Sequence, residues 1–365
     1  MALQCGIVGL PNVGKSTLFN ALTSAKALAA NYPFATKEPN IGVITVPDPR
    51  LDKLSELVNP QKVQPTTVDI VDIAGLIKGA SKGEGLGNQF LGNIREVDAI
   101  LHVIRCFEDD NVVHVDGNVD PVRDKEVIDT ELIFKDLDVV EKRLEKLKKA
   151  AKTGEKAAKK AVEIAEKMIA HLESGQSMRS LDLEDDGKVM LKEMMLLTAK
   201  PILYICNVDL DSVNDGNAFT EQLKAAVANE DAEVLLICAD IEADIAELDT
   251  KEERDEFLEE MGLSEPGVNR VIQSAYKLLN LITYFTAGVK EVRAWTIIDG
   301  TKAPGAAGVI HTDFEKGFIR AEVISYENFV HYGSEQAVRE AGKQGVEGKE
   351  YVVKDGDVMH FRFNV

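Results

Sequence analysis

Short apolar runs rich in β-branched residues recur along the chain, and stretches with helical periodicity separate them. The runs predict strands at residues 3–8, 41–46, 66–71, 99–105 and 201–206. Eight residues after the first run, the apolar spacing of residues 17–28 predicts a helix. Because strands that alternate with helices build parallel sheets, we expect residues 3 to about 275 to form an α/β domain with a doubly wound, mainly parallel sheet.

The pattern changes between about residues 128 and 171, where Lys, Glu, Ala and Leu predominate. Apolar residues follow one another there at the three- or four-residue spacing of an amphipathic helix, at Leu137, Val140, Leu144 and Leu147. A second helical stretch covers about residues 157–172. We therefore expect a helical hairpin or coiled coil, inserted into the first domain over about residues 126–198.

From about residue 284 the chain alternates short β-like runs with glycine turns. The runs are residues 293–298, 308–311, 319–325, 351–353 and 358–363, and Asp355-Gly356 is a turn signal between the last two. The pattern predicts a small separate α+β domain at residues 278–365, after a first domain at residues 1–275. His311, His331 and His360 are too dispersed to indicate a metal site.

The first predicted strand leads into Gly9-Leu10-Pro11-Asn12-Val13-Gly14-Lys15-Ser16, which has the G-x-x-x-x-G-K-S spacing of a phosphate-binding loop. In such a loop the glycines let successive backbone N–H groups surround a triphosphate at the positive end of a helix. Lys15 would contact the β- and γ-phosphates, and the Ser16 hydroxyl would bind Mg²⁺. A chance glycine turn is the alternative, but the order of strand, loop and helix favours a P-loop NTPase.

A second motif, Asp72-Ile73-Ala74-Gly75, follows the strand at residues 66–71. P-loop enzymes place a metal-binding carboxylate here, so Asp72 is predicted to hold Mg²⁺ through water. Thr36 lies between the two motifs, where a threonine adds a second hydroxyl to Mg²⁺, and a plain turn residue is the alternative. The glycine-rich residues 79–87 are predicted to be a switch ordered by the γ-phosphate, with a flexible loop as the alternative.

The nucleotide base is expected beside Asn207-Val208-Asp209-Leu210, where GTPases have N-K-x-D. The Asp of that motif accepts two hydrogen bonds from guanine. Leu210 at this position cannot accept them, and each unmade bond costs about 1–3 kcal/mol. Adenine has an unprotonated N1 and a 6-amino group that Asn207 and nearby backbone could satisfy, so ATP is predicted over GTP. Asp209 could present a carboxylate after a local shift, which leaves GTP as the alternative.

The charge distribution adds a second expected partner. The chain has 365 residues, of which 45% are hydrophobic, and a formal net charge of −20, which argues against nucleic-acid binding by the whole surface. Residues 142–160, however, hold nine Lys or Arg residues against two Glu residues, so the predicted hairpin carries a basic stretch. A solvated helix face is the ordinary explanation, and contact with the phosphate backbone of RNA is the interpretation we favour.

The remaining features predict a cytoplasmic protein. Four Cys residues are scattered in or beside apolar runs without a C-x-x-C spacing, which argues against zinc binding and redox catalysis. The first residues lack the basic and apolar regions of a signal peptide. No uncharged apolar run approaches the roughly 18 residues that a membrane span needs.

Together the motifs resemble those of the YchF-type Obg-like ATPases. The resemblance rests on G-L-P-N-V-G-K-S, N-Y-P-F-A-T at residues 31–36, D-I-A-G-L, the altered N-K-x-D, the helical insertion and the terminal domain, and it covers essentially the whole chain. It implies a nucleotide domain of TRAFAC GTPase descent, a coiled-coil arm and a C-terminal TGS domain of β-grasp form. It also implies Mg²⁺-dependent hydrolysis of ATP in preference to GTP, and association with ribosomes.

The resemblance also implies roles for individual residues. Phosphate contacts come from Asn12, Val13, Gly14, Lys15, Ser16 and Thr17. Ser16 and Thr36 bind Mg²⁺, and Asn207 with the Val208 backbone contacts the base. The family usually has N-x-x-E at the base site, and Leu210 replaces the Glu here, which removes one expected contact without restoring guanine recognition.

One further substitution concerns the attacking water. Ras-type enzymes orient it with a glutamine after D-x-x-G, and this chain has Leu76 there, so hydrolysis is expected to be slow or to use another group. His114, in a polar loop, is the internal candidate to position the water, and a surface-loop histidine is the alternative. His102 lies in an apolar run and is expected to be a core residue. A GTPase, or a nucleotide-locked RNA- or ribosome-binding protein with negligible turnover, remains an alternative function.

Overall fold

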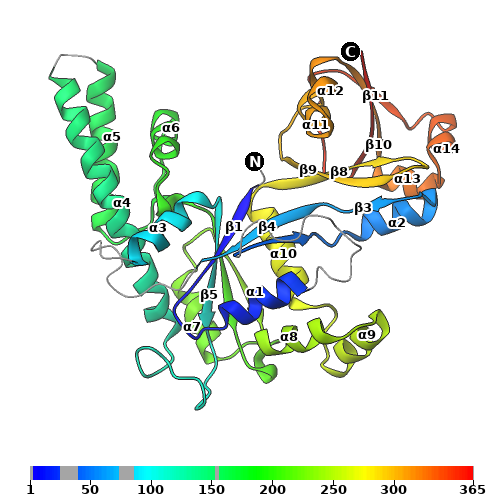
Figure 1. The fold of residues 1–365 in the computed structure, drawn as a ribbon. Helices are drawn as coiled ribbons and strands as arrows, with labels where there is room; N and C mark the ends of the chain where they lie inside the picture. The colour runs from blue at the N-terminus through cyan, green and yellow to red at the C-terminus, as the bar shows by residue number, and fades with distance from the viewer. Residues whose placement is uncertain (1–2, 25–39, 74–85, 153–155, 365) are drawn as a thin grey trace. The chain divides into compact units, whose positions relative to one another are not determined.

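A computed structural model describes residues 3–24, 40–73, 86–152 and 156–364 of the chain (Figure 1). Its contacts divide the chain into two compact units, Met1–Gly42 with Asp69–Val271, and Val43–Val68 with Ile272–Val365. Three predicted features lie outside the described residues: the metal ligand Thr36, Leu76 in place of a water-orienting glutamine, and residues 79–85 of the switch predicted at 79–87.

The first unit contains a six-stranded sheet with the order β2-β4-β1-β5-β6-β7. β1 pairs in parallel with β4 and β5, and β6 pairs in parallel with β5 and β7. The central strands β5 and β6 are buried along their whole length, as expected for a sheet covered on both faces. The predicted, mainly parallel sheet is confirmed. Its strands are β1 Gln4–Val8, β2 Ile41–Thr45, β4 Thr67–Asp72, β5 Ala99–Arg105, β6 Ile202–Asn207 and β7 Glu233–Ile237.

Helices connect these strands. The helix predicted at residues 17–28 begins two residues earlier, as α1 (Lys15–Ser24), and residues 25–28 lie outside the described part of the chain. α1 packs against α8, which follows β7. The other helices of this part are α3 Leu86–Glu96, α7 Ala218–Ala226, α8 Ala239–Glu247, α9 Lys251–Glu260 and α10 Gly267–Leu278, with the 3₁₀ turn η5 Leu210–Ser212.

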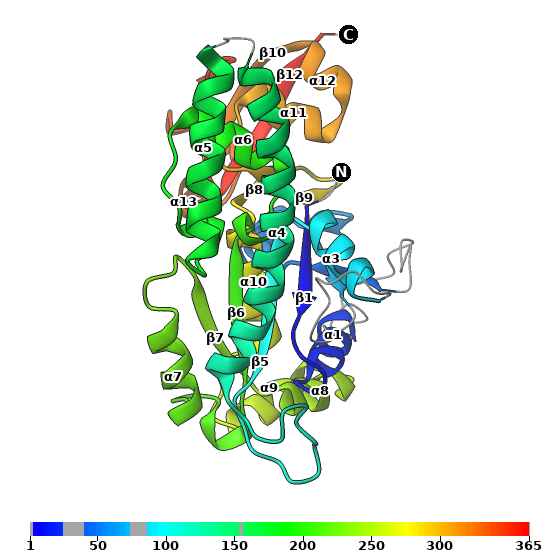
Figure 2. The same ribbon diagram turned by 90° about the vertical axis from the view of Figure 1, so that its left-hand side faces the viewer.

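A helical hairpin follows β5, in the region where the sequence predicts inserted helices. Its first helix, α4 (Pro121–Ala151), has Asp120 as N-cap, with the Asp side chain accepting from the Arg123 N–H at 3.0 Å, and Pro121 in its first turn. α4 and α5 (Lys156–Glu173) pack side by side and extend away from β5 (Figures 1 and 2). Their shared core includes Val140 and Met168. The hairpin is completed by η3 Met178–Ser180, α6 Asp185–Met194 and η4 Leu197–Ala199.

A buried carboxylate fixes the base of this hairpin. Asp136 of α4 is 0% exposed, and its carboxylate accepts hydrogen bonds from the backbone N–H groups of Leu197 and Thr198, both at 2.8 Å. The Thr198 hydroxyl donates a third bond at 2.7 Å, and the same hydroxyl accepts from the Met178 N–H at 3.1 Å. One side chain therefore satisfies the first backbone donors of η4 and joins it to α4.

The second unit contains a mixed six-stranded sheet with the order β11-β10-β12-β8-β9-β3. β8 pairs antiparallel with β9, β10 pairs antiparallel with β11 and β12, and β12 is parallel to β8. Its strands are β3 Val63–Gln64, β8 Leu281–Ala287, β9 Val292–Ile298, β10 Phe318–Ser325, β11 Gly345–Glu347 and β12 Asp357–Phe363. Its helices are α2 Pro49–Val58, α11 Ala303–Ile310, α12 Thr312–Lys316, α13 Tyr326–Tyr332 and α14 Glu335–Glu340.

Both faces of this second sheet are covered. Tyr284 of β8 belongs to the core beneath α11, whereas its neighbour Phe285 belongs to the core that contains Leu51 and Leu54 of α2. β3 adds a short parallel pair to β9. α2 and β3, which lie far before the sequence boundary at 275–278, therefore contribute to the core and the sheet of the second unit.

Two short β-like runs of the C-terminal region are not strands. Residues 308–311 were predicted as a strand, which is wrong, because α11 extends to Ile310. Pro304 in its first turn and the small side chains of Ala306 and Ala307, both fully buried, allow this helix to lie close against the sheet. Residues 351–353 form one isolated bridge, between Val352 and Lys302, and the predicted turn at Asp355-Gly356 is present, with Gly356 at φ +88°.

The four cysteines are all buried, and none of them forms a disulfide. Burial raises the pKa of the Cys5 thiol to about 12, and it raises the pKa of Cys238 as well. Among the described residues, no helix is both long and apolar enough to cross a membrane.

Candidate nucleotide site

The phosphate-binding loop runs from the end of β1 to the start of α1. Asn12 and Gly14 have left-handed backbones, with φ of 61° and 93°. A Cβ on Gly14 would clash with the Asn207 amide nitrogen, and one on Gly9 would clash with the Val103 carbonyl oxygen. Both glycines are therefore required, because the loop passes close to β5 and β6 before its backbone turns toward the start of α1.

Lys15 occupies the first position of α1 and is buried. Its ammonium donates a hydrogen bond to the Leu10 carbonyl oxygen at 2.6 Å, across the opening of the loop. Burial lowers the pKa of Lys15 to about 8, and the nearby Asp72 carboxylate partly opposes this effect. When a triphosphate is bound in the loop, its phosphate oxygens would replace the Leu10 carbonyl oxygen as stronger acceptors for the Lys15 ammonium.

Ser16 and Asp72 offer the oxygen donors that Mg²⁺ prefers. Ser16 follows Lys15 in the first turn of α1 and is exposed. Asp72 ends β4, next to β1, and burial raises its pKa while the charge of Lys15 lowers it. The two residues fit a hydroxyl and a water-mediated carboxylate for the metal, and the third predicted ligand, Thr36, lies outside the described residues.

Asn207 joins three segments around the loop. Its side-chain amide donates to the Val13 carbonyl oxygen at 3.0 Å, and its side-chain oxygen accepts from the Ala239 N–H at 3.0 Å. Asn207 ends β6 and is 5% exposed, so it links β6, the phosphate loop and the start of α8. This gives Asn207 a positioning task in addition to the base contact that the sequence predicts.

The residues after Asn207 present no free carboxylate at the guanine-reading position. Val208 is 2% exposed, and Leu210 is 47% exposed. The Asp209 carboxylate accepts from the Ser212 N–H at 2.9 Å and caps η5. Asp209 is thus engaged in local structure, and the exposed aliphatic side chain of Leu210 has no hydrogen-bonding group.

A well-anchored loop between β5 and α4 borders the phosphate loop. The Arg105 side chain, 2% exposed, donates to the carbonyl oxygens of Val112, Phe107 and Asp109 at 2.8, 3.0 and 3.2 Å. Asn12 of the phosphate loop donates to the Val113 carbonyl oxygen at 3.2 Å. The structure therefore places the residue before His114 in contact with the nucleotide site.

His114 itself is directed away from solvent. Its Nε2 lies 2.8 Å from Oδ2 of Asp124 in the first turn of α4, and its Nδ1 accepts from the Asp116 N–H at 3.1 Å. The ligand atoms of these three residues lie within 4.8 Å of one another, but the Arg123 guanidinium already contacts Asp124 at 2.9 Å and supplies a positive charge there. His102 is a core residue as expected, 1% exposed, and burial lowers its pKa to about 3.

Two protein-family models match parts of this chain. One family model, described as a 50S ribosome-binding GTPase, matches residues 4–167, and a YchF GTPase C-terminal model, described as a protein of unknown function, matches residues 281–364. The Escherichia coli O157:H7 protein named "Ribosome-binding ATPase YchF" is 60% identical over 365 residues, which is 100% of both chains. This chain belongs to the YchF family.

Two further YchF proteins support the assignment. The Bacillus subtilis (strain 168) protein of the same name is 55% identical over 367 residues, with 100% of each chain covered. A solved structure of the Schizosaccharomyces pombe YchF GTPase matches with a TM-score of 0.90 at 42% identity, covering 99% of this chain and 97% of the other. The predicted P-loop α/β fold and the predicted family are both confirmed.

In this YchF-family protein, sequence reasoning missed two residues of the site. Arg105 was included in an apolar strand run, although a charged residue at the end of a fully buried strand is itself a signal of a specific partner. Asp124 gave no comparable signal, because an acidic residue in the first turn of a helix is common. Its partner His114 becomes visible only once the loop is folded.

Proposed function

We propose that this chain is a Mg²⁺-dependent ATPase that acts as a nucleotide-controlled switch on the ribosome. The observation that carries the choice of ATP is the base site, where Leu210 replaces a carboxylate and Asp209 is used to cap η5. Relatives at 60% and 55% identity bear the name "Ribosome-binding ATPase YchF". The second candidate is a GTPase, favoured by the name of the Schizosaccharomyces pombe relative.

In the proposed reaction a water attacks the γ-phosphate in line with the bond to the leaving oxygen. Lys15 leaves the Leu10 carbonyl and contacts the β- and γ-phosphates, where its charge stabilises the transition state. Backbone N–H groups of residues 12–17 surround the phosphates, and Ser16, Thr36 and Asp72 would hold Mg²⁺, which supplies charge stabilisation when bound. Asn207 and the Val208 backbone contact the base.

His114 is proposed to position the attacking water, since Leu76 cannot. Support comes from its loop, which contacts Asn12 of the phosphate loop through the carbonyl of Val113. Replacement of His114 by Ala should then lower kcat with little change in ATP affinity. A kcat equal to that of the wild type would make the histidine structural.

The choice of nucleotide is tested by binding measured side by side. We expect ATP to bind at least about tenfold more tightly than GTP at the same Mg²⁺ concentration, because guanine would lose two hydrogen bonds to a carboxylate. Single-turnover assays with and without ribosomes then separate an ATPase from a nucleotide-locked binder, which returns ATP unhydrolysed. Equal affinities for the two nucleotides would contradict the preference for ATP.

The ribosome contact is proposed to involve the basic stretch of the helical hairpin. Several of its charges are already paired, since Lys142, Lys148 and Lys160 contact Asp138, Glu166 and Asp186 at 2.7–2.8 Å. Within the described part of the hairpin, Lys146 and Lys149 have no ion-pair partner and so remain available for phosphate groups. The TGS-like C-terminal unit, residues 278–365, is proposed as the alternative contact surface.

Charge reversal tests the hairpin. Lys146→Glu with Lys149→Glu and Lys152→Glu should weaken ribosome binding and lower the dependence of log K on log salt, by up to about 0.9 for each phosphate group that the variant no longer neutralises. Lys148 is left unchanged because it pairs with Glu166. The matched control reverses three exposed lysines of the other unit, Lys343, Lys349 and Lys354. Weaker binding only in this control would move the contact to the C-terminal unit.

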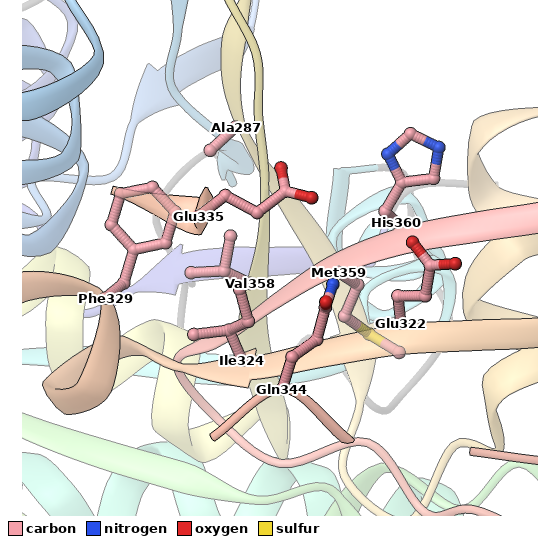
Figure 3. Close-up of a pocket in the computed structure, with 9 residues that line it drawn as sticks. All are labelled: Ala287, Glu322, Ile324, Phe329, Glu335, Gln344, Val358, Met359 and His360. Atoms are coloured by element: carbon pink, nitrogen blue, oxygen red, sulfur yellow. The ribbon is translucent and has the colours of Figure 1, made fainter. Parts of the chain in front are cut away.

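The pocket found in the C-terminal unit is too small for a nucleotide. Figure 3 shows the residues that line it, with Phe329 and Glu335 at one end and Glu322 and His360 at the other. The pocket has a free volume of about 10 Å³, which is room for about one water molecule. It is therefore not a second candidate for the nucleotide, which we propose binds at the phosphate loop.

A further inference from the structure

Both ring nitrogens of His114 are engaged by the protein. Because the Asp116 backbone N–H donates to Nδ1, this nitrogen carries no proton, and the proton on Nε2 is donated to the Asp124 carboxylate 2.8 Å away. The His114 side chain is 4% exposed. In this arrangement neither nitrogen is available to a water molecule at the γ-phosphate.

Asp124 is built to hold the histidine. Its side chain is 3% exposed, with one oxygen on His114 and the other on the Arg123 guanidinium at 2.9 Å. Arg123 is fixed in turn, since its guanidinium donates to the side chain and the carbonyl oxygen of Asn118 at 2.8 and 2.7 Å. The carboxylate is thus oriented from the start of α4, outside the phosphate loop.

The backbone beside His114 already touches the nucleotide site. Asn12 binds the carbonyl of Val113, and Arg105 holds the carbonyl of Val112. The loop therefore lies against the phosphate loop while the imidazole is directed at α4. For the ring to leave α4 and reach the nucleotide, its hydrogen bond with Asp124 must break, whereas the bond from the Asp116 N–H lies within the loop itself.

We propose that Asp124 is a positioning residue that withholds His114 from the nucleotide, and that displacement of the first turn of α4 releases the histidine. The proposal rests on the proposed function, in which His114 orients the attacking water. Asp124 then determines the fraction of molecules in which His114 is released. His114 determines the rate of hydrolysis in those molecules.

The same helix carries the basic stretch of the hairpin. α4 has 31 residues, so it is about 45 Å long, with Asp124 in its first turn and Lys146 and Lys149 near its end. Next to Asp124, Lys125 is paired with Asp129 and Glu230, both at 2.7 Å, which ties this turn to the segment after α7. A phosphate-bearing partner bound at the far end of α4 would therefore bind the same helix whose first turn holds His114, and the proposal takes this helix as the link between the two.

The test is ATP turnover by Asp124→Ala, with ribosomes as the probe for the hairpin. We expect kcat without ribosomes to rise by about threefold or more while KM stays the same, because the released state of His114 is more populated. Added ribosomes should stimulate this variant less than the wild type. In the double variant with His114→Ala, the rise should disappear, and kcat should equal that of His114→Ala alone.

Control variants separate this role from a structural one. Asp124→Asn keeps an oxygen acceptor for Nε2–H and should raise kcat less than the alanine variant does. Asp110→Ala removes an exposed charge from the same loop and should leave kcat unchanged. Thermal unfolding monitors folding, and Asp124→Ser replaces the alanine variant if that variant unfolds.

The outcomes are distinguishable. A kcat of Asp124→Ala that falls to the level of His114→Ala would overturn the proposal, because Asp124 would then orient the histidine for the reaction. An unchanged kcat would overturn it as well. If His114→Ala hydrolyses ATP at the wild-type rate, the water-positioning part of the proposed function fails instead, and a wild-type protein without turnover would refute the ATPase itself.

Discussion

Replacement of Lys15 by Ala should lower kcat for ATP by about 10²- to 10³-fold or more, with a smaller effect on ATP binding. The ammonium is the one buried cation of the phosphate loop, held at its opening by the Leu10 carbonyl oxygen at 2.6 Å. It contributes most when charge develops on the transferred phosphoryl group, and the backbone N–H groups of the loop still bind the ground state. Steady-state hydrolysis and ATP titration by fluorescence measure the two effects.

Lys53→Ala, which removes an exposed lysine on α2, is the matched control and should hydrolyse ATP normally. Retained hydrolysis in Lys15→Ala would refute the assignment of the loop.

The pH profile gives a second readout. Because the pKa of Lys15 in the free protein is about 8, kcat/KM should fall above that pH as the lysine loses its proton. Bound phosphates raise the pKa of Lys15, so kcat should begin to fall only at a higher pH than kcat/KM does.

Asp136→Ala should be the most destabilising single change in the hairpin. It removes a 0% exposed carboxylate that accepts three hydrogen bonds, and it leaves the N–H groups of Leu197 and Thr198 buried without their acceptor. We expect a loss of about 3–5 kcal/mol in the free energy of unfolding. Urea denaturation measures the loss, and hydrogen exchange at these two N–H groups locates it.

Asp138→Ala is the matched control on the same helix. Its side chain is 46% exposed and pairs with Lys142 one turn later, so its removal should cost no more than about 0.5 kcal/mol. Equal losses in the two variants would show that Asp136 does not clamp the base of the hairpin. Exchange that increases throughout the sheet, rather than around η4, would show that the hairpin does not open as a local unit.

The sequence predicted those parts of the fold that depend on neighbouring residues. The apolar runs of β1, β5 and β6 and the amphipathic spacing of α4 were sufficient, because burial on a sheet or a helix face leaves a local period. Residues 308–311 were misassigned because a short apolar run is compatible with a strand or a helix. The buried alanines that precede the run pack as part of α11.

Contacts between residues that are far apart in the chain could not be predicted from the sequence. Asn207 and Val13 are 194 positions apart, and the packing of Leu51 against Phe285 joins segments that no periodicity connects. The phosphate site was recognised because its residues are contiguous. The restraint on His114 was missed since its partner, ten positions along the chain, belongs to a helix whose pattern shows only an ordinary first turn.

The burial of all four cysteines makes the native thiols unreactive toward alkylating reagents while the chain is folded. Their raised pKa values keep Cys5 and Cys238 protonated near neutral pH, and the thiolate is the reactive form. A fluorophore can therefore be attached to a cysteine introduced at an exposed position of α4 or α5 without first removing the native ones. In the wild type, the slow labelling of the native cysteines then measures how often the structure around them opens. The same rate serves as the background for the labelled variant.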